Sequence, residues 1–125
     1  MKDGITFDTG ALIALERRSL RARQIVERAL EAKLRITVPS PVLTEWWRGR
    51  TDLRERIVAA VRIESMSREL AQRAGEALAA VRGSTPIDAI VMASAASRGD
   101  VVYTSDVDDL TRLQLHFPGV RVLHV

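Results

Sequence analysis

Hydrophobic positions recur along the chain at two different spacings. Short apolar stretches rich in β-branched residues are typical of buried strands. They occupy residues 5–7, 61–64, 101–104 and 120–123, and residues 34–38 alternate apolar with polar side chains, which also predicts a strand. Other stretches repeat their apolar residues every three or four positions, which is the spacing of an amphipathic helix. They cover residues 11–15, 20–32, 41–47, 51–61, 70–81 and 86–98, and a last short helix opens at residues 108–109.

Residues that begin and end helices support these assignments. Thr51 and Thr85 each precede a helical stretch and can act as N-caps, while Gly83 and Gly99 follow the stretches of residues 70–81 and 86–98. Ser40 before Pro41 predicts another N-cap, with the proline as first helical residue. Because strands alternate with helices, the pattern predicts a parallel sheet covered on both faces. No repeat or linker interrupts it, so we expect one α/β domain over residues 1–125.

The composition narrows the functional classes. Hydrophobic residues make up 46% and charged residues 28% of the chain, which is the composition of a folded globular protein rather than a disordered one. No uncharged apolar run approaches the roughly 18 residues of a membrane helix. The absence of cysteine excludes a disulfide framework and a cysteine zinc site. These features predict a cytoplasmic protein without a membrane partner.

The net charge of +3 is carried almost entirely by arginine, since Lys2 and Lys33 are the lysines in the sequence. The planar guanidinium matches phosphate oxygens, so this composition suits a nucleic-acid partner. Solvated helix faces explain many surface arginines equally well. Arg48 and Arg50 are the candidates for contacting nucleic-acid phosphate, with a purely solvated role as the alternative.

Four acidic residues follow the predicted strands. Asp8 ends the first strand, Glu45 lies in the helix after the second, Asp88 opens the helix of residues 86–98, and Asp106 follows the strand of residues 101–104. The carboxyl ends of parallel strands share one edge, where ligands of open α/β sheets bind. Carboxylates gathered there favour Mg²⁺ or Mn²⁺, whose known chemistry includes phosphodiester hydrolysis.

Each acid also has a structural interpretation. Asp8 can cap the first helix, Asp88 stands three residues after Thr85 as in a capping box, and Asp106 belongs to a polar turn. Glu45 can be a solvated helix residue. Spacing alone does not separate these interpretations from a metal site.

Four segments, in order, resemble the PIN-domain family and especially the VapC-type toxins of bacterial toxin–antitoxin pairs. They read FDTGALI at residues 7–13, VPSPVLTE at 38–45, PIDAIVMASA at 86–95 and VVYTSDVDDL at 101–110. The resemblance implies a five-stranded parallel sheet in the order 3-2-1-4-5 and Mg²⁺- or Mn²⁺-dependent cleavage of RNA. It implies that Asp8, Glu45, Asp88 and Asp106 are the metal-binding and catalytic residues.

The same resemblance implies further roles and partners. Thr9 and Thr104 would orient the carboxylates, although an ordinary strand residue is an equal alternative for Thr104, and Asp108 would have a weaker role through water. A cognate antitoxin would cover the site, and the protein would form a homodimer. The apolar residues Trp46, Trp47, Leu53 and Ile57, in helices of residues 40–81, are the expected dimer contact.

Two other functions are compatible with parts of the pattern. A PIN-type RNA-processing or decay nuclease would have the same acids and no antitoxin. A receiver-like signalling module also gathers acids and Mg²⁺ at strand ends. It would need two adjacent early acids, a central aspartate at a strand end and a late lysine, which this sequence does not have. His116 and His124 have no acidic neighbour that would indicate a catalytic role.

Overall fold

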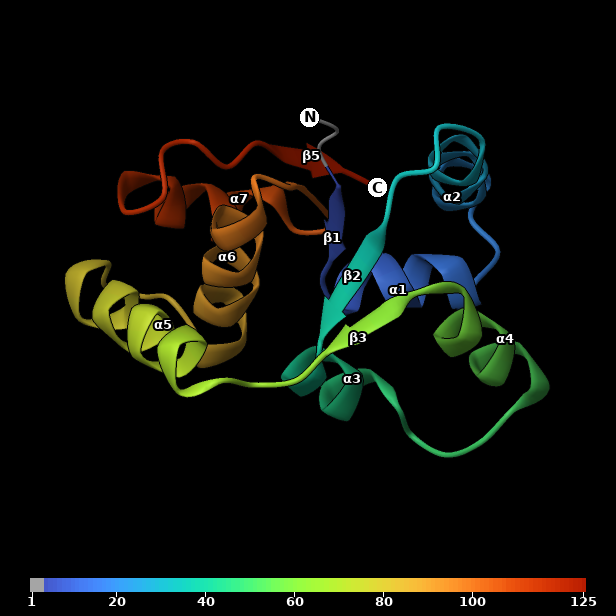
Figure 1. Ribbon diagram of the computed structural model, residues 1–125, viewed down its shortest axis with the longest axis horizontal. Helices are drawn as coiled ribbons and strands as arrows, with labels where there is room; N and C mark the ends of the chain where they lie inside the picture. The colour runs from blue at the N-terminus through green and yellow to red at the C-terminus, as the bar shows by residue number, and fades with distance from the viewer. Residues whose placement is uncertain (1–3) are drawn as a thin grey trace.

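The computed structural model describes residues 4–125. Five strands form one parallel sheet in the order β3-β2-β1-β4-β5 (Figure 1). The strands are β1 (Ile5–Phe7), β2 (Ile36–Pro39), β3 (Arg62–Glu64), β4 (Val101–Thr104) and β5 (Val122–His124). The predicted fold class and strand order are therefore confirmed. A receiver-type sheet would have the order 2-1-3-4-5, so that alternative is wrong.

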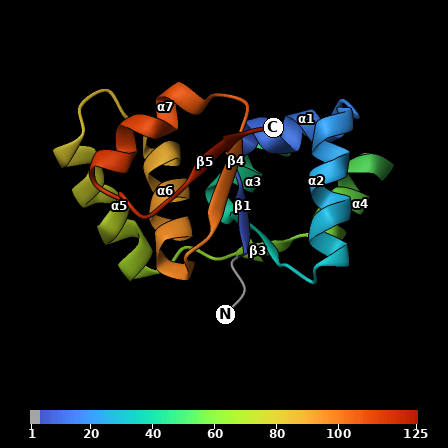
Figure 2. The same ribbon diagram turned by 90° about the horizontal axis from the view of Figure 1, so that it is seen from above.

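Helices cover both faces of the sheet (Figures 1 and 2). One layer contains α1 (Thr9–Glu16), α2 (Leu20–Glu31) and α4 (Asp52–Ala60). The opposite layer contains α5 (Arg68–Ala80), α6 (Pro86–Arg98) and α7 (Val107–Thr111), and a 3₁₀ turn over Arg112–Leu115 follows. The short helix α3 (Ser40–Trp46) contacts both α1 and α6. The helix α3 therefore lies where the two layers meet.

The central strands are buried on both sides because helices pack on both faces. Phe7 of β1, Val38 of β2 and Val102 of β4 have no exposed surface. The threonines between the apolar residues of β1 and β2, Thr6 and Thr37, are buried as well, as expected for strands covered on both faces. Within residues 4–125, no helix is long and apolar enough to cross a bilayer.

Helix boundaries agree with the sequence signals at most ends. The hydroxyls of Thr51 and Thr85 accept backbone N–H groups of their own helices, and Gly99 ends α6 with a left-handed backbone at φ +74°. The prediction for Ser40 is wrong. Strand β2 runs through Pro39 directly into α3, so Ser40 is already helical and Pro39 occupies the cap position without a side-chain hydrogen bond.

The two adjacent tryptophans have different environments. Trp46 is 3% exposed and belongs to the core, as does Ile57 at 8%. Trp47 and Leu53 are half-buried. The expectation that all four residues form an exposed dimer surface is therefore wrong for Trp46 and Ile57. These two side chains fill the space between α1, α3 and α4 that a domain of this size would otherwise leave open.

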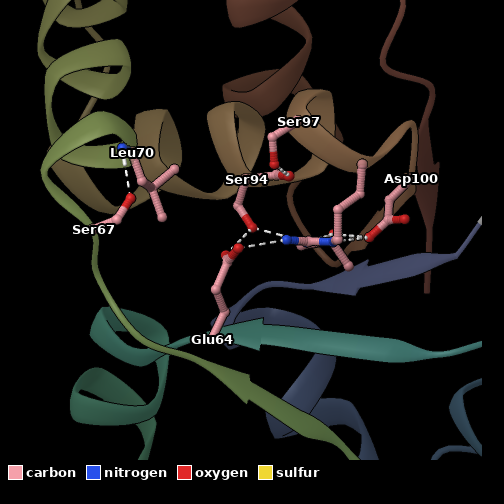
Figure 3. A network of polar contacts seen from close by, with 8 residues as sticks. Glu64, Ser67, Leu70, Ser94, Ser97 and Asp100 are labelled. Carbon is pink, nitrogen blue, oxygen red and sulfur yellow. Dashed lines mark hydrogen bonds and ion pairs between the residues drawn. The ribbon is translucent and has the colours of Figure 1, made fainter.

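A buried polar network ties α6 to the sheet (Figure 3). The guanidinium of Arg98 donates to Glu64 Oε2 at 2.7 Å, Asp100 Oδ2 at 2.9 Å and Thr6 Oγ1 at 2.9 Å. Ser94, which faces Glu64 in Figure 3, donates to the other carboxylate oxygen of Glu64. Two carboxylates and one guanidinium thus join β1, β3 and β4 to the end of α6.

Candidate active site

Asp8 is the most buried of the four predicted site residues, with 8% of its surface exposed. It follows β1 and precedes α1. Its Oδ1 accepts the backbone N–H of Ala11 at 2.9 Å, as expected for an N-cap. Its Oδ2 accepts the hydroxyl of Thr104 at 2.5 Å. Asp8 is therefore both a helix cap and a carboxylate held from the neighbouring strand.

The loop after β4 packs closely against the start of α1. A Cβ atom built at Gly10 would lie 2.1 Å from Ser105 Oγ and 3.1 Å from the backbone nitrogen of Ser105. A larger residue at position 10 would push this loop away. Gly10 therefore allows the segment that carries Asp106 to lie beside the segment that carries Asp8. No signal in the sequence marks Gly10, because the close approach depends on how the loop after β4 packs.

Thr104 connects the two segments through its hydroxyl group. It donates to Asp8 and accepts the backbone N–H of Asp106 at 2.9 Å. The side chain of Thr104 is fully buried, so both bonds are shielded from water. Asp106 is itself exposed and stands at the start of α7.

Asp88 and Glu45 enter the same region from two other helices. Asp88 lies half-buried in the first turn of α6, where its backbone N–H donates to the Thr85 hydroxyl at 3.2 Å. Glu45 is exposed near the end of α3, and its Oε1 accepts the hydroxyl of Thr9 from α1 at 2.5 Å. Thr9 and Thr104 thus each donate to one of the acids.

The charges of these acids raise the pKa values of their neighbours in the set. Burial raises the pKa of Asp8 to about 6, against hydrogen bonds from Thr104 and Ala11 that lower it, and the charges of Asp88 and Asp106 raise it further. Burial also raises the pKa of Asp88, as do the charges of Asp109, Asp106 and Glu45. The four acids therefore share one region of strong negative potential.

Asp109 belongs to this region as well. The pKa of Asp106 is raised first by a hydrogen bond with the Asp109 side chain and then by slight burial and the Asp109 charge. Sequence reasoning treated Asp109 only as part of a turn, because its position one helical turn after Asp106 carries no specific signal. Asp108 is exposed, and its charge also raises the pKa of Asp106.

The donor set suits a hard divalent cation. All candidate ligands are carboxylate oxygens, and a cation among them would relieve the repulsion that raises the pKa values of Asp8 and Asp88. In the conformation described for residues 4–125, no three acidic or histidine side chains stand close enough together to hold a metal ion. Glu45 instead accepts the hydroxyl of Thr9, and Asp106 lies against Asp109, a contact between two acids that raises the pKa of Asp106. Metal binding would therefore require rotation of these two exposed side chains.

The two histidines and the two candidate phosphate-binding arginines lie at different places on the surface. His116 and His124 are exposed. Arg50 lies 3.9 Å from Glu55 in an exposed ion pair, whereas Arg48 donates to the backbone oxygen of Glu45 at 3.0 Å. Arg48 is thus the one of the two predicted phosphate-binding arginines that lies next to an acid of the set.

A family model described as the PIN domain matches residues 5–114 of the chain. No curated protein sequence matches it. Among solved structures, the DNA-bound VapBC from Salmonella typhimurium has a TM-score of 0.76 at 18% identity, covering 98% of this chain and 98% of that chain. VapBC2 from Rickettsia felis, bound to a promoter DNA fragment, has a TM-score of 0.80 at 12% identity over 97% and 98%. A toxin–antitoxin complex from Klebsiella pneumoniae has a TM-score of 0.72 at 24% identity over 94% and 95%.

Proposed function

The chain belongs to the PIN-domain family, and we propose that residues 1–125 are one PIN-like domain that cleaves RNA as the toxin of a toxin–antitoxin pair. PIN domains are nucleases that typically use divalent metals. More specifically, the proposed activity is that of a Mg²⁺- or Mn²⁺-dependent endoribonuclease. It acts in the cytoplasm and without a membrane partner.

The observation that carries this proposal is the environment of Asp8. This carboxylate is buried, its pKa is raised to about 6, and the charged groups that shift it are two other acids, Asp88 and Asp106, with no arginine or lysine among them. An acid kept for folding alone would be expected to have a cationic partner, as Glu64 and Asp100 have in Arg98. A buried carboxylate whose charged neighbours are also acids is typical of a site that receives a cation.

Asp8, Glu45, Asp88 and Asp106 would hold the metal. When bound, a divalent ion lowers the pKa of water and stabilises the attacking and leaving oxygens of a phosphodiester. Thr104 fixes the orientation of Asp8 and the backbone of Asp106. Thr9 donates its hydroxyl to Glu45 and so orients this exposed carboxylate beside the start of α1. Burial of Asp8 keeps one carboxylate immobile, so the exposed acids complete the site around it.

Partners follow from the same assignment. The three similar structures are described as VapBC or toxin–antitoxin complexes, which supports a cognate antitoxin that blocks the site. The protein would form a homodimer through helices of residues 40–81, where Leu43, Thr44, Trp47 and Val58 line an apolar groove. An RNA-processing PIN nuclease without an antitoxin is the second candidate, and the same acids support it.

Cleavage of RNA tests the proposal. The full chain should cut members of a diverse RNA panel in Mn²⁺ or Mg²⁺ and stop cutting when a chelator is added. Asp88→Asn should abolish cleavage, whereas Asp52→Asn, an exposed aspartate in the first turn of α4, should cut normally. Full activity in chelator would contradict the metal requirement. Unchanged activity with saturating cognate antitoxin would contradict only the toxin role.

A further inference from the structure

A cleft of about 680 Å³ opens beside Glu45, between the outer face of α1 and the segment from the end of α3 to α4. Thr9, Ile13, Glu16 and Arg17 line one wall, at the spacing that places residues on a single helix face. The other wall consists of Glu45, Trp46, Arg48 and Arg54. Glu45 therefore belongs both to the acid set and to the cleft, which makes the cleft continuous with the candidate active site.

Some charged side chains in the cleft have an ion-pair partner, and others have none among the residues that the structure describes. Glu16 accepts the indole N–H of Trp46 at 3.0 Å and pairs with Arg54 at 2.8 Å, so these charges neutralise each other. Arg17 and Arg48 are exposed, and neither makes an ion pair with any acid in the part of the chain that the structure describes. Arg48 is anchored through its Nε to the Glu45 carbonyl, which leaves its terminal nitrogens for another partner. The cleft thus offers two cationic groups without acidic partners next to a strongly acidic site.

We infer that this cleft binds the sugar-phosphate backbone of single-stranded RNA, with Arg17 and Arg48 contacting phosphates next to the scissile one. The inference rests on the proposed function and specifies where the substrate lies. A polyanion is repelled by the acid set, so a nuclease with these acids needs cations nearby to hold its substrate. The two arginines are the groups in the cleft that can supply this attraction. Guanidinium groups also match phosphate geometry.

A protein partner fits this cleft less well than RNA does. Centres of protein interfaces are depleted in charged residues and rich in apolar ones. The large apolar side chain of Trp46 is 3% exposed and therefore offers little surface to a partner. An apolar groove suited to a protein does exist, on the side of α3 and α4 lined by Leu43, Trp47 and Val58. The two grooves thus differ in the chemistry that they present.

The test compares two double variants with the same net charge. Arg17→Gln/Arg48→Gln removes both cleft cations. Arg68→Gln/Arg73→Gln removes two exposed arginines from α5, which lies on the opposite side of the sheet (Figures 1 and 2). Binding of a fluorescein-labelled unstructured 12-nucleotide RNA is followed by anisotropy in chelator over a series of KCl concentrations. Cleavage of the same RNA is measured in Mn²⁺.

For single-stranded nucleic acid, each lost phosphate contact reduces the slope of log affinity against log salt by about 0.7. The cleft variant should therefore lose about 1.4 from this slope and raise KM while kcat stays within about twofold of wild type. The α5 variant should match wild type in all three quantities. The inference would be overturned if the cleft variant kept the wild-type slope and KM, or if both variants lost the same amount of slope and affinity. RNA cleavage by wild type would still support the proposed function in either case. A cleft variant that loses only antitoxin binding would also overturn the inference. Absence of RNA cleavage by wild type would overturn the proposed function itself.

Discussion

The hydroxyl of Thr104 donates to Asp8 Oδ2 at 2.5 Å and accepts the backbone N–H of Asp106 at 2.9 Å. One buried side chain on β4 therefore fixes the position of two acids from different segments. Such an arrangement ties the geometry of the candidate metal site to the register between β1 and β4, in which Phe7 pairs with Tyr103. A shift in that register would separate the acids.

Replacing Thr104 by valine should damage both stability and activity. Valine has a similar shape but no hydroxyl, so an oxygen of Asp8 and the N–H of Asp106 lose their partner. Unfolding in urea should show a loss of about 1–3 kcal/mol. Apparent Mn²⁺ affinity in the cleavage assay should fall about 10–100-fold, as for other groups that orient metal ligands. Thr104→Ser keeps the hydroxyl and is the control. Wild-type metal dependence in Thr104→Val would contradict the positioning role.

Stability without metal should depend on pH through Asp8. Because the pKa of this acid rises from 3.8 to about 6 on folding, the folded state binds its proton more tightly than the unfolded chain does. The resulting stabilisation is complete below about pH 4 and is lost as pH rises through about 6. A shift of this size corresponds to about 3 kcal/mol. Urea unfolding of wild type and Asp8→Asn between pH 4 and 7.5 should show the wild type losing stability relative to the variant. A constant difference would contradict the raised pKa.

Arg98 should be a residue of the fold and not of the reaction. Arg98→Met leaves the buried Asp100 and the partly buried Glu64 without their cation, which should cost about 3–5 kcal/mol in urea unfolding. Arg73→Met on the exposed face of α5 should stay within about 0.5 kcal/mol of wild type. At a temperature where Arg98→Met is folded, its RNA cleavage per folded molecule should equal that of wild type. Equal stability of the two variants would contradict the importance of the network.

The proposed dimer should depend on Trp47. Its half-buried ring lies in the apolar groove of α3 and α4, where a glutamate would place a charge against the partner. Sedimentation should show a wild-type dimer and a folded Trp47→Glu monomer at micromolar concentration. Leu115→Glu, at an 84% exposed position, is the control and should remain dimeric. Monomeric wild type at high micromolar concentration would contradict the dimer.

The element order was readable from the sequence because central parallel strands are buried on both faces. Residues 5–7 and 101–104 appear as short apolar runs for this reason, and both are strands. Boundaries with a side-chain cap, such as those at Thr51 and Thr85, were also readable. The N-cap prediction for Ser40 is wrong because a serine before a proline resembles a cap even where a strand runs directly into a helix. The strand order itself came from the resemblance and not from spacing.

Only part of the candidate site could be predicted from the sequence. Three of the four acids stand out because they follow a strand or open a helix, and Glu45 lies in the helix that follows the second strand. The hydrogen bond between Thr104 and Asp8 joins residues 96 positions apart, so only their placement in the sheet shows it. The pairing of Asp106 with Asp109 and the approach of Gly10 to Ser105 depend on how the loop after β4 packs. The sequence does not distinguish Arg17 as a residue of the cleft, because it is one arginine among many on helix surfaces.

Asp8 is proposed to be a metal ligand. A thermal melt tests this role most directly, comparing wild type with Asp8→Asn at pH 7.5, in chelator and in saturating Mn²⁺. Asparagine keeps an oxygen for the Ala11 N–H but removes a charge that burial and neighbouring acids disfavour. In chelator, the variant should therefore melt at a higher temperature than wild type. Mn²⁺ at a hundredfold excess over its dissociation constant should stabilise wild type by about 2.7 kcal/mol and the variant much less. A variant that melts below wild type in chelator and gains as much stability from Mn²⁺ would contradict the claim.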